Sequence, residues 1–283
     1  MNQKFSLNSA IKILTYNIGD CCYGTNDKYK YVLGKQFDSF YKAPKTQVEE
    51  NLNGVINIIE SGNYDICLLQ EVNALTPVNY YINANKKITE YFKDYQSCFQ
   101  SNSNILNIVN NGNLTLSKHS TSFEQHKIPI RGKGFVNNLA YVHKALTIAR
   151  IPIEDTKSNL VIYNIHLTPF SRNLDVKRAQ FKYILALAKA EYEKGNYCVI
   201  GGDWNTGLDD IPFEKEIKEV LNDNIWEFIC VDGITRSAHK KDRLDTSTLD
   251  GFYFSPNITG NIKSLENFKY SDHSPVELLI TLK

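Results

Sequence analysis

The chain of 283 residues lacks an excess of charge of either sign. Its 32 lysines and arginines nearly balance its 31 aspartates and glutamates, for a formal net charge of +1. This balance excludes attraction of nucleic acid by overall charge, so an anionic ligand would need a local basic patch. The sequence also lacks an apolar segment as long as a membrane span or a secretory signal. We therefore expect no transmembrane segment and a cytoplasmic protein, or a secreted one if a leader was removed.

Cysteine patterns typical of metal knuckles are missing as well. None of the six cysteines stands in a Cys-x-x-Cys spacing, and Cys67 and Cys198 fall inside predicted strands. Reduced, buried thiols are therefore favoured over a disulfide framework. No linker rich in proline, serine or glycine and no internal repeat divides the chain. We expect a single domain over residues 1–283, and a monomer.

Segments with strand and helix periodicity alternate along the chain. Helical spacing of apolar residues predicts helices at 46–61, 78–92, 174–193 and 213–221. Strands are expected at 11–16, 65–71, 112–117, 123–130, 139–151, 160–167, 197–203, 249–255 and 275–282. The three between 112 and 151 are close enough to be antiparallel neighbours, and 232–247 is expected to be a polar loop. This pattern predicts an α/β (α+β) fold with two mixed sheets packed face to face and helices outside.

What the sequence does contain is polar residues where five apolar stretches end. They are Asn17, Glu71, His166, Asp203 with Asn205, and Asp272 with His273. Strands that end in carboxylates, carboxamides and imidazoles are typical of a hydrolytic metal site. Gly201 and Gly202, just before Asp203, allow close approach of the backbone.

Oxygen donors dominate this set, which suits Mg²⁺ or Mn²⁺ better than zinc. His273 could act as a general base for water at neutral pH. A base needs a partner to fix its tautomer, and Asp250, at the start of a strand, is a candidate. Each of these residues taken alone is more often a capping, solvated or packing residue than a catalytic one, so the hypothesis depends on the joint pattern.

These residues stand in six ordered motifs: Tyr16-Asn17, Gln70-Glu71-Val72, Asn164-Ile165-His166-Leu167, Gly202-Asp203-Trp204-Asn205, Leu249-Asp250-Gly251-Phe252 and Ser271-Asp272-His273-Ser274-Pro275. The six motifs resemble those of a bacterial-type member of the endonuclease/exonuclease/phosphatase (DNase I-like) superfamily. Relatives include pancreatic-type DNases, abasic-site endonucleases, bacterial sphingomyelinases and inositol-polyphosphate 5-phosphatases. The resemblance spans residues 11–282. It implies a four-layer sandwich, a site at one end of two packed sheets, and Mg²⁺-dependent hydrolysis of phosphoesters.

The resemblance also implies roles on the metal side of the site. Glu71 would be the principal metal carboxylate, with Asn17 beside it and Asp272 assisting. Abasic-site nucleases carry an acidic residue two positions after the asparagine, where this chain has Gly19. Asp20 stands one position further, so the metal shell need not be identical.

On the catalytic side, Asp203 would align the attacking water and Asn205 would bind the phosphoryl oxygens. His273 would be the general base, oriented by Asp250. His166 would bond the scissile phosphate or leaving oxygen. Abasic-site enzymes lack a histidine at that place, which argues against abasic-site repair. The strand start at Lys144 also resembles the family and is taken as scaffold with possible phosphate contacts.

Two basic stretches adjoin the predicted site, and each could instead be a solvated surface. The candidate substrate-binding residues are Arg172, Asn173, Lys177, Arg178, Arg236, Lys240, Lys241 and Arg243. A near-neutral protein that binds an anion needs such a rim, and one extended along two loops favours nucleic acid. The alternative is a phospholipid, phosphoinositide or sphingomyelin phosphodiesterase or phosphatase, although no loop is clearly suited to enter a bilayer. A non-catalytic module should have lost site residues, yet all are present. DNA or RNA, endo- or exo-action, and one or two metals stay open.

Overall fold

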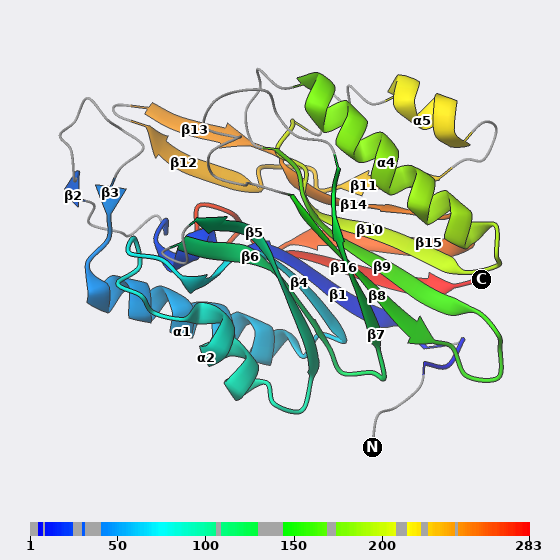
Figure 1. Ribbon diagram of the computed structural model, residues 1–283, viewed down its shortest axis with the longest axis horizontal. Helices are drawn as coiled ribbons and strands as arrows, with labels where there is room; N and C mark the ends of the chain where they lie inside the picture. The colour runs from blue at the N-terminus through cyan, green and yellow to red at the C-terminus, as the bar shows by residue number, and fades with distance from the viewer. Residues whose placement is uncertain are drawn as a thin grey trace.

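The computed structural model describes residues 5–7, 9–24, 30–31, 41–105, 109–129, 144–168, 174–207, 214–221, 226–240 and 243–283. Two six-stranded mixed sheets pack face to face (Figure 1). Helices α1 (Lys45–Gly62) and α2 (Ala84–Tyr91) cover the outer face of the first sheet. Helices α4 (Leu174–Tyr192) and α5 (Glu214–Leu221) cover the second. The predicted four-layer sandwich is confirmed.

The first sheet has the order β15-β16-β1-β4-β6-β5. Its strands are β1 (Ile11–Asn17), β4 (Ile66–Leu75), β5 (Gln96–Ile105), β6 (Val109–Ser117), β15 (Ile258–Ser264) and β16 (Val276–Leu282). Strands β1 and β4 are parallel, and β1 pairs with β16 in the antiparallel sense. The first and last strands of the chain are therefore neighbours in the middle of this sheet.

The second sheet has the order β11-β14-β10-β9-β8-β7. Its strands are β7 (Ser122–Lys127), β8 (Ala145–Pro152), β9 (Asn159–His166), β10 (Tyr197–Asp203), β11 (Glu227–Cys230) and β14 (Asp250–Phe254). Strands β9 and β10 are parallel, with α4 between them in sequence. The described residues also form two small antiparallel pairs: β2 (Lys30–Tyr31) with β3 (Tyr41–Lys42), and the hairpin of β12 (Arg236–Lys240) with β13 (Arg243–Ser247).

Alternation along the strands builds the core between the sheets. Inward positions such as Ile13, Leu68, Ile162 and Val199 are fully buried in one apolar cluster. Residues two apart on a strand face the same side, so this cluster follows from the period-2 pattern. Within the described residues, no helix is long and apolar enough to cross a membrane.

Several predicted elements differ from the structure. Segments 112–117 and 123–130 are not neighbours, because β6 lies in the first sheet and β7 in the second, where it pairs with β8. Residues 232–247 are not a loop throughout, since they contain the β12–β13 hairpin. The helix expected at 78–92 is shorter: it starts after Asn83, whose side chain accepts a hydrogen bond from the Lys86 amide at 2.8 Å and caps it. Strands β5, β11 and β15 were not predicted, and residues 130–143 lie outside the described part.

Candidate active site

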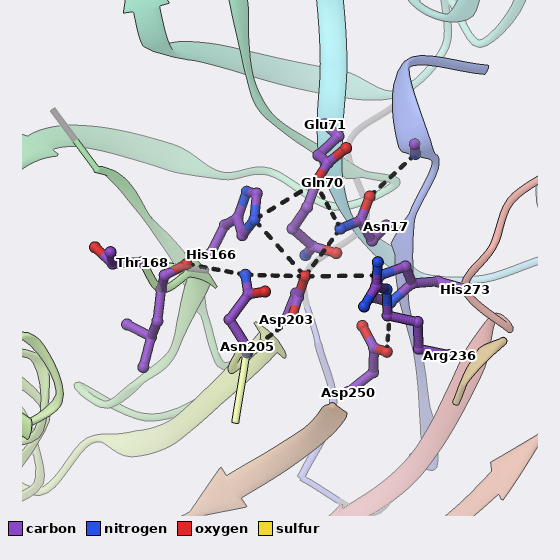
Figure 2. A network of polar contacts seen from close by, with 12 residues as sticks. Asn17, Gln70, Glu71, His166, Thr168, Asp203, Asn205, Arg236, Asp250 and His273 are labelled. Carbon is purple, nitrogen blue, oxygen red and sulfur yellow. Dashed lines mark hydrogen bonds and ion pairs between the residues drawn. The ribbon is translucent and has the colours of Figure 1, made fainter. Parts of the chain in front are cut away.

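The polar ends of the central strands meet at one end of the sandwich. Because β1 is parallel to β4 and β9 to β10, their C-terminal ends lie together at the gap between the sheets. Asp250 joins them because β14 runs antiparallel to β10, in register with Asp203. Figure 2 shows the residues brought together: Asn17, Glu71, His166, Asp203, Asn205, Arg236, Asp250 and His273. The first sheet contributes Asn17 and Glu71, and the second contributes His166, Asp203 and Asp250.

Glu71 reaches the site through a β-bulge. The pairing of β4 with β6 shifts register between Leu69 and Val72, and Glu71 has a φ of 52°. A bulge of this kind re-aims one side chain out of the regular alternation. The Glu71 Oε1 lies 3.2 Å from Asn17 Nδ2 and 3.7 Å from His166 Nε2. Strand β4 continues beyond it to Leu75, so Glu71 interrupts the strand and does not end it.

Asn17 links the two sheets at the centre of the site. Its Nδ2 donates to Asp203 Oδ2 at 2.9 Å and to Glu71, while its Oδ1 accepts from the Gly19 amide at 3.0 Å. In this orientation the amide nitrogen faces both carboxylates. Burial opposes ionisation of Asp203, yet His273, His166 and Asn17 hold the pKa of its carboxyl below the usual value. Asp203 is thus a buried carboxylate in its charged form.

Asn205 faces Asp203 from a left-handed backbone conformation, with φ of 51°. Its main-chain amide donates to Asp203 Oδ1 at 2.8 Å. Its side-chain Nδ2 donates to Leu167 O at 2.9 Å and to Asp203 Oδ2 at 3.2 Å. Lys177 of α4, which is buried, donates to the Asn205 carbonyl. Both hydrogens of the Asn205 side-chain amide therefore form hydrogen bonds, and the bond from Lys177 of α4 stabilises the strained backbone of Asn205.

His273 and Asp250 form a buried pair. The two side chains are 5% and 1% exposed, and His273 Nδ1 lies 2.8 Å from Asp250 Oδ2. Burial opposes the charged ring, but Asp250, Asp203 and Asp272 raise the pKa of His273 to about 10. The other ring nitrogen, Nε2, is 3.9 Å from Asp203 Oδ2. The pair therefore presents one nitrogen of the ring to the Asp203 carboxylate.

His166 and Lys144 differ from this pair, because burial favours the neutral form of both side chains. Burial, followed by the nearby Lys144 ammonium, lowers the pKa of His166 to about 3, so its ring is neutral. Its Nε2 is 3.6 Å from Asp203 Oδ2. Burial also lowers the pKa of Lys144 to about 8, although Glu71 and Asp203 oppose the shift. Sequence reasoning gave Lys144 only a minor place, since nothing in a strand-initial lysine shows that it will be buried beside two carboxylates.

Carboxylates crowd the Glu71 side of the site. Burial, then Asp20 and Asp272, raise the pKa of Glu71 to about 7. Asp20 is half-buried, and its Oδ1 accepts hydrogen bonds from Asn73 and Asn111. Oxygen and imidazole atoms of Glu71, His166 and Asp203 lie within 4.8 Å of one another. A set of hard oxygens whose mutual repulsion disfavours ionisation fits a bound divalent cation such as Mg²⁺ or Mn²⁺.

Of the predicted substrate rim, Arg236 and Lys177 lie at the site. Arg236 Nε donates to Asp272 Oδ2 at 3.2 Å, and its charge is also stabilised by Asp203 and Glu71. Arg178 is the next residue of α4 after Lys177, and its guanidinium lies 3.9 Å from the Asp175 carboxylate. Lys240 and Arg243 pair through their backbones in the β12–β13 hairpin. Arg172, Asn173 and Lys241 fall outside the described residues.

Comparison with known proteins gives a family and a fold. No curated protein matches the sequence. The structure is similar to an endonuclease/exonuclease/phosphatase from Bacteroides vulgatus (TM-score 0.66, 15% identity, 97% of this chain and 100% of that one). It is similar to a family protein from Leptotrichia buccalis (0.66, 16%, 95% and 99%) and to TDP2 of D. rerio, solved with a single strand DNA product (0.63, 15%, 96% and 99%). At these identities the likeness shows the fold. The family model for the Endonuclease/Exonuclease/phosphatase family matches residues 14–273, so the chain belongs to that family.

Proposed function

We propose that this protein is a divalent-metal-dependent phosphoester hydrolase that cleaves phosphodiester bonds in nucleic acid by base-activated attack of water. One observation carries the proposal. The His273–Asp250 pair faces Asp203, and Asn17 joins Asp203 to the carboxylate of Glu71 across the gap between the sheets. A base, a water-aligning carboxylate and a cation site thereby converge within one connected network of polar side chains.

Glu71 and Asp272 would hold Mg²⁺ or Mn²⁺, with Asp203 and His166 close to the same position. Asn17 would orient the carboxylates through its Nδ2, since its Oδ1 is already bonded to Gly19. When bound, the cation would polarise a phosphoryl oxygen and stabilise the negative charge that develops there.

His273 would take the proton from the attacking water through Nε2, because Nδ1 is held by Asp250. Asp203 would align that water with Oδ2, the atom that faces the ring. The pKa of about 10 keeps the ring protonated at neutral pH. The ring therefore becomes a proton acceptor only where the negative charge around it is offset.

The remaining residues would bind the phosphate. Neutral His166 can donate a hydrogen bond from Nε2, and Lys144 and Arg236 supply positive charge beside it. Asn205 would reach a phosphoryl oxygen by exchanging one of its present bonds, to Leu167 O or Asp203, for the new one. These residues together offset the charge of a single scissile phosphate.

Nucleic acid is the substrate class that we propose. The D. rerio TDP2 structure contains a single strand DNA product, and our chain shares that fold. Arg236 and the backbone of the basic β12–β13 hairpin extend from the site, where a polynucleotide could continue. Within the described residues, the large exposed apolar side chains Tyr81, Tyr91, Ile234 and Leu279 come from separate parts of the sequence. No single described loop therefore presents several exposed apolar side chains for entry into a bilayer, so the lipid alternative gains no support from them.

A substrate panel tests the proposal. Purified protein with Mg²⁺ is offered plasmid DNA, single-stranded DNA, RNA, sphingomyelin vesicles and inositol phosphates, with EDTA as the matched control. We expect cleavage of a polynucleotide that EDTA abolishes and that His273→Ala reduces by about 10²–10⁴-fold. If only sphingomyelin or inositol phosphates were hydrolysed, the substrate would be one of these and not nucleic acid. Absence of any metal-dependent hydrolysis would refute the hydrolase proposal.

A further inference from the structure

The core between the sheets changes character just below the active site. On β4 the inward positions run Ile66, Leu68 and then Gln70; on β9 they run Ile162 and then Asn164, before His166. Asn164 stands two residues before the histidine of the site, and Gln70 stands immediately before Glu71. A layer of amides therefore separates the apolar core from the catalytic residues.

These amides form direct hydrogen bonds from one sheet to the other. Gln70 Nε2 donates to Asn164 Oδ1 at 2.8 Å and to Thr15 Oγ1 at 3.2 Å. Asn164 Nδ2 donates to Leu114 O at 3.2 Å and to Thr115 Oγ1 at 3.1 Å. Both Gln70 and Asn164 are fully buried. The bond between them joins the strand that carries Glu71 to the strand that carries His166.

The layer continues toward Lys144. Asn113 Nδ2 lies 3.4 Å from Asn164 O, and Asn102 donates to Asn113 Oδ1 at 2.9 Å. Asn102 in turn accepts from the amide of Ala145, the residue after Lys144, at 2.5 Å. The strand that begins beside Lys144 is thus tied to the same network.

Buried amides are an expensive way to fill a core, because each must find partners to replace water. Apolar packing is non-directional and would leave the two sheets free to slide or tilt by small amounts. A hydrogen bond is directional and fixes both separation and register. The site needs a fixed separation and register of the sheets, because Asn17 and Glu71 come from one sheet and His166 and Asp203 from the other.

We propose that Gln70 and Asn164 are positioning residues that set the spacing of the two sheets beneath the metal-binding and phosphate-binding side chains. The inference rests on the proposed function, because it assumes that Glu71 and its neighbours bind a divalent cation. Neither amide needs to touch the substrate. Their effect passes through Glu71, the next residue on β4, and through His166, two residues along β9.

The test compares Gln70→Met, Asn164→Leu and the double variant with the parent. Each single change leaves buried polar groups without a partner, so we expect a lower melting temperature. Removing both amides replaces the bond with apolar packing, so the double variant should regain part of that loss. We nevertheless expect the double variant to bind Mn²⁺ about 10–100-fold more weakly, measured by electron paramagnetic resonance of free Mn²⁺. Turnover should fall by about 10²-fold, as for a small misplacement of reacting groups.

Ile162→Ala is the matched control, because Ile162 lies two residues before Asn164 on β9 and its apolar side chain is buried in the cluster between the sheets. We expect it to lower the melting temperature while leaving Mn²⁺ affinity unchanged. A double variant that fails to fold, or that binds Mn²⁺ and turns over like the parent, overturns the positioning role. A parent that binds no Mn²⁺ would instead refute the proposed function, so the two failures are distinguishable.

Discussion

Replacing Asp250 with asparagine removes the buried negative charge that faces the His273 ring at 2.8 Å, while nearly preserving its shape. The carboxylates around His273 raise its pKa from 6.5 to about 10. That net rise, reached against the opposing effect of burial, corresponds to about 5 kcal/mol of preferential stabilisation of the charged ring. Asp250 is the one in direct hydrogen-bond contact, so its neutralisation should lower the pKa by about 1–3 pH units.

The metal-free protein in EDTA allows a direct measurement of this pKa by NMR titration of the imidazole. We expect a midpoint near pH 10 in the parent and a clearly lower one in Asp250→Asn. The sign of the stability effect follows. Because the folded pKa is raised, the pair stabilises the protein fully below about pH 6.5, and this stabilisation is lost as pH rises through about 10. The difference in melting temperature between parent and variant should therefore shrink in alkaline solution.

The same variant should turn over about 10²–10⁴-fold more slowly, because the ring loses the partner that fixes its tautomer. The double variant Asp250→Asn/His273→Ala should be no slower than His273→Ala alone, since the two act as a unit. Asp232→Asn is a matched control that removes an exposed carboxylate, and it should change neither quantity. An unchanged His273 pKa, or additive losses of turnover in the double variant, would refute the assignment of Asp250.

Much of this site could be predicted because β-strands alternate with a period of two. Asn17, His166 and Asp203 each continue an inward-facing series on their strand, so their convergence follows from the sequence once the strands are parallel. The family and the sandwich fold were likewise predicted from ordered motifs and are confirmed. The sequence pattern was sufficient for these residues because the alternation along a strand alone decides to which face of the sheet a side chain points.

Other features depend on which segments become neighbours, and local pattern does not determine that. Whether residues 112–117 pair with 123–130 depends on a crossing between sheets within residues 118–121. The bulge at Glu71 is a mismatch between β4 and β6, so neither strand shows it alone. Lys144 looks like a solvated strand-initial lysine until β8 is placed against the site. Gln70 and Asn164 become partners only when the two sheets pack.

Three further predictions concern charge at the site. Glu71→Gln keeps the shape of the side chain but removes its charge, so Mn²⁺ affinity and turnover should fall together; equal Mn²⁺ binding in titration calorimetry would exclude Glu71 as a ligand. Lys144→Met should weaken binding of a single phosphate but change the melting temperature little, because burial already disfavours the charge of the lysine in the folded protein. The last prediction separates a polynucleotide from a single phosphate group. In a catalytically inactive Asp203→Ala background, binding of single-stranded DNA should weaken steeply with salt, because each phosphate contact releases counterions. Adding Arg236→Gln should reduce the log–log salt slope by about one unit. Lys157→Gln should matter less, because this exposed lysine lies in the turn between β8 and β9, at the other end of these strands from Lys144 and His166. A shallow slope that Arg236→Gln leaves unchanged would mean that Arg236 serves only Asp272, and that the protein recognises one phosphate and not a phosphate backbone.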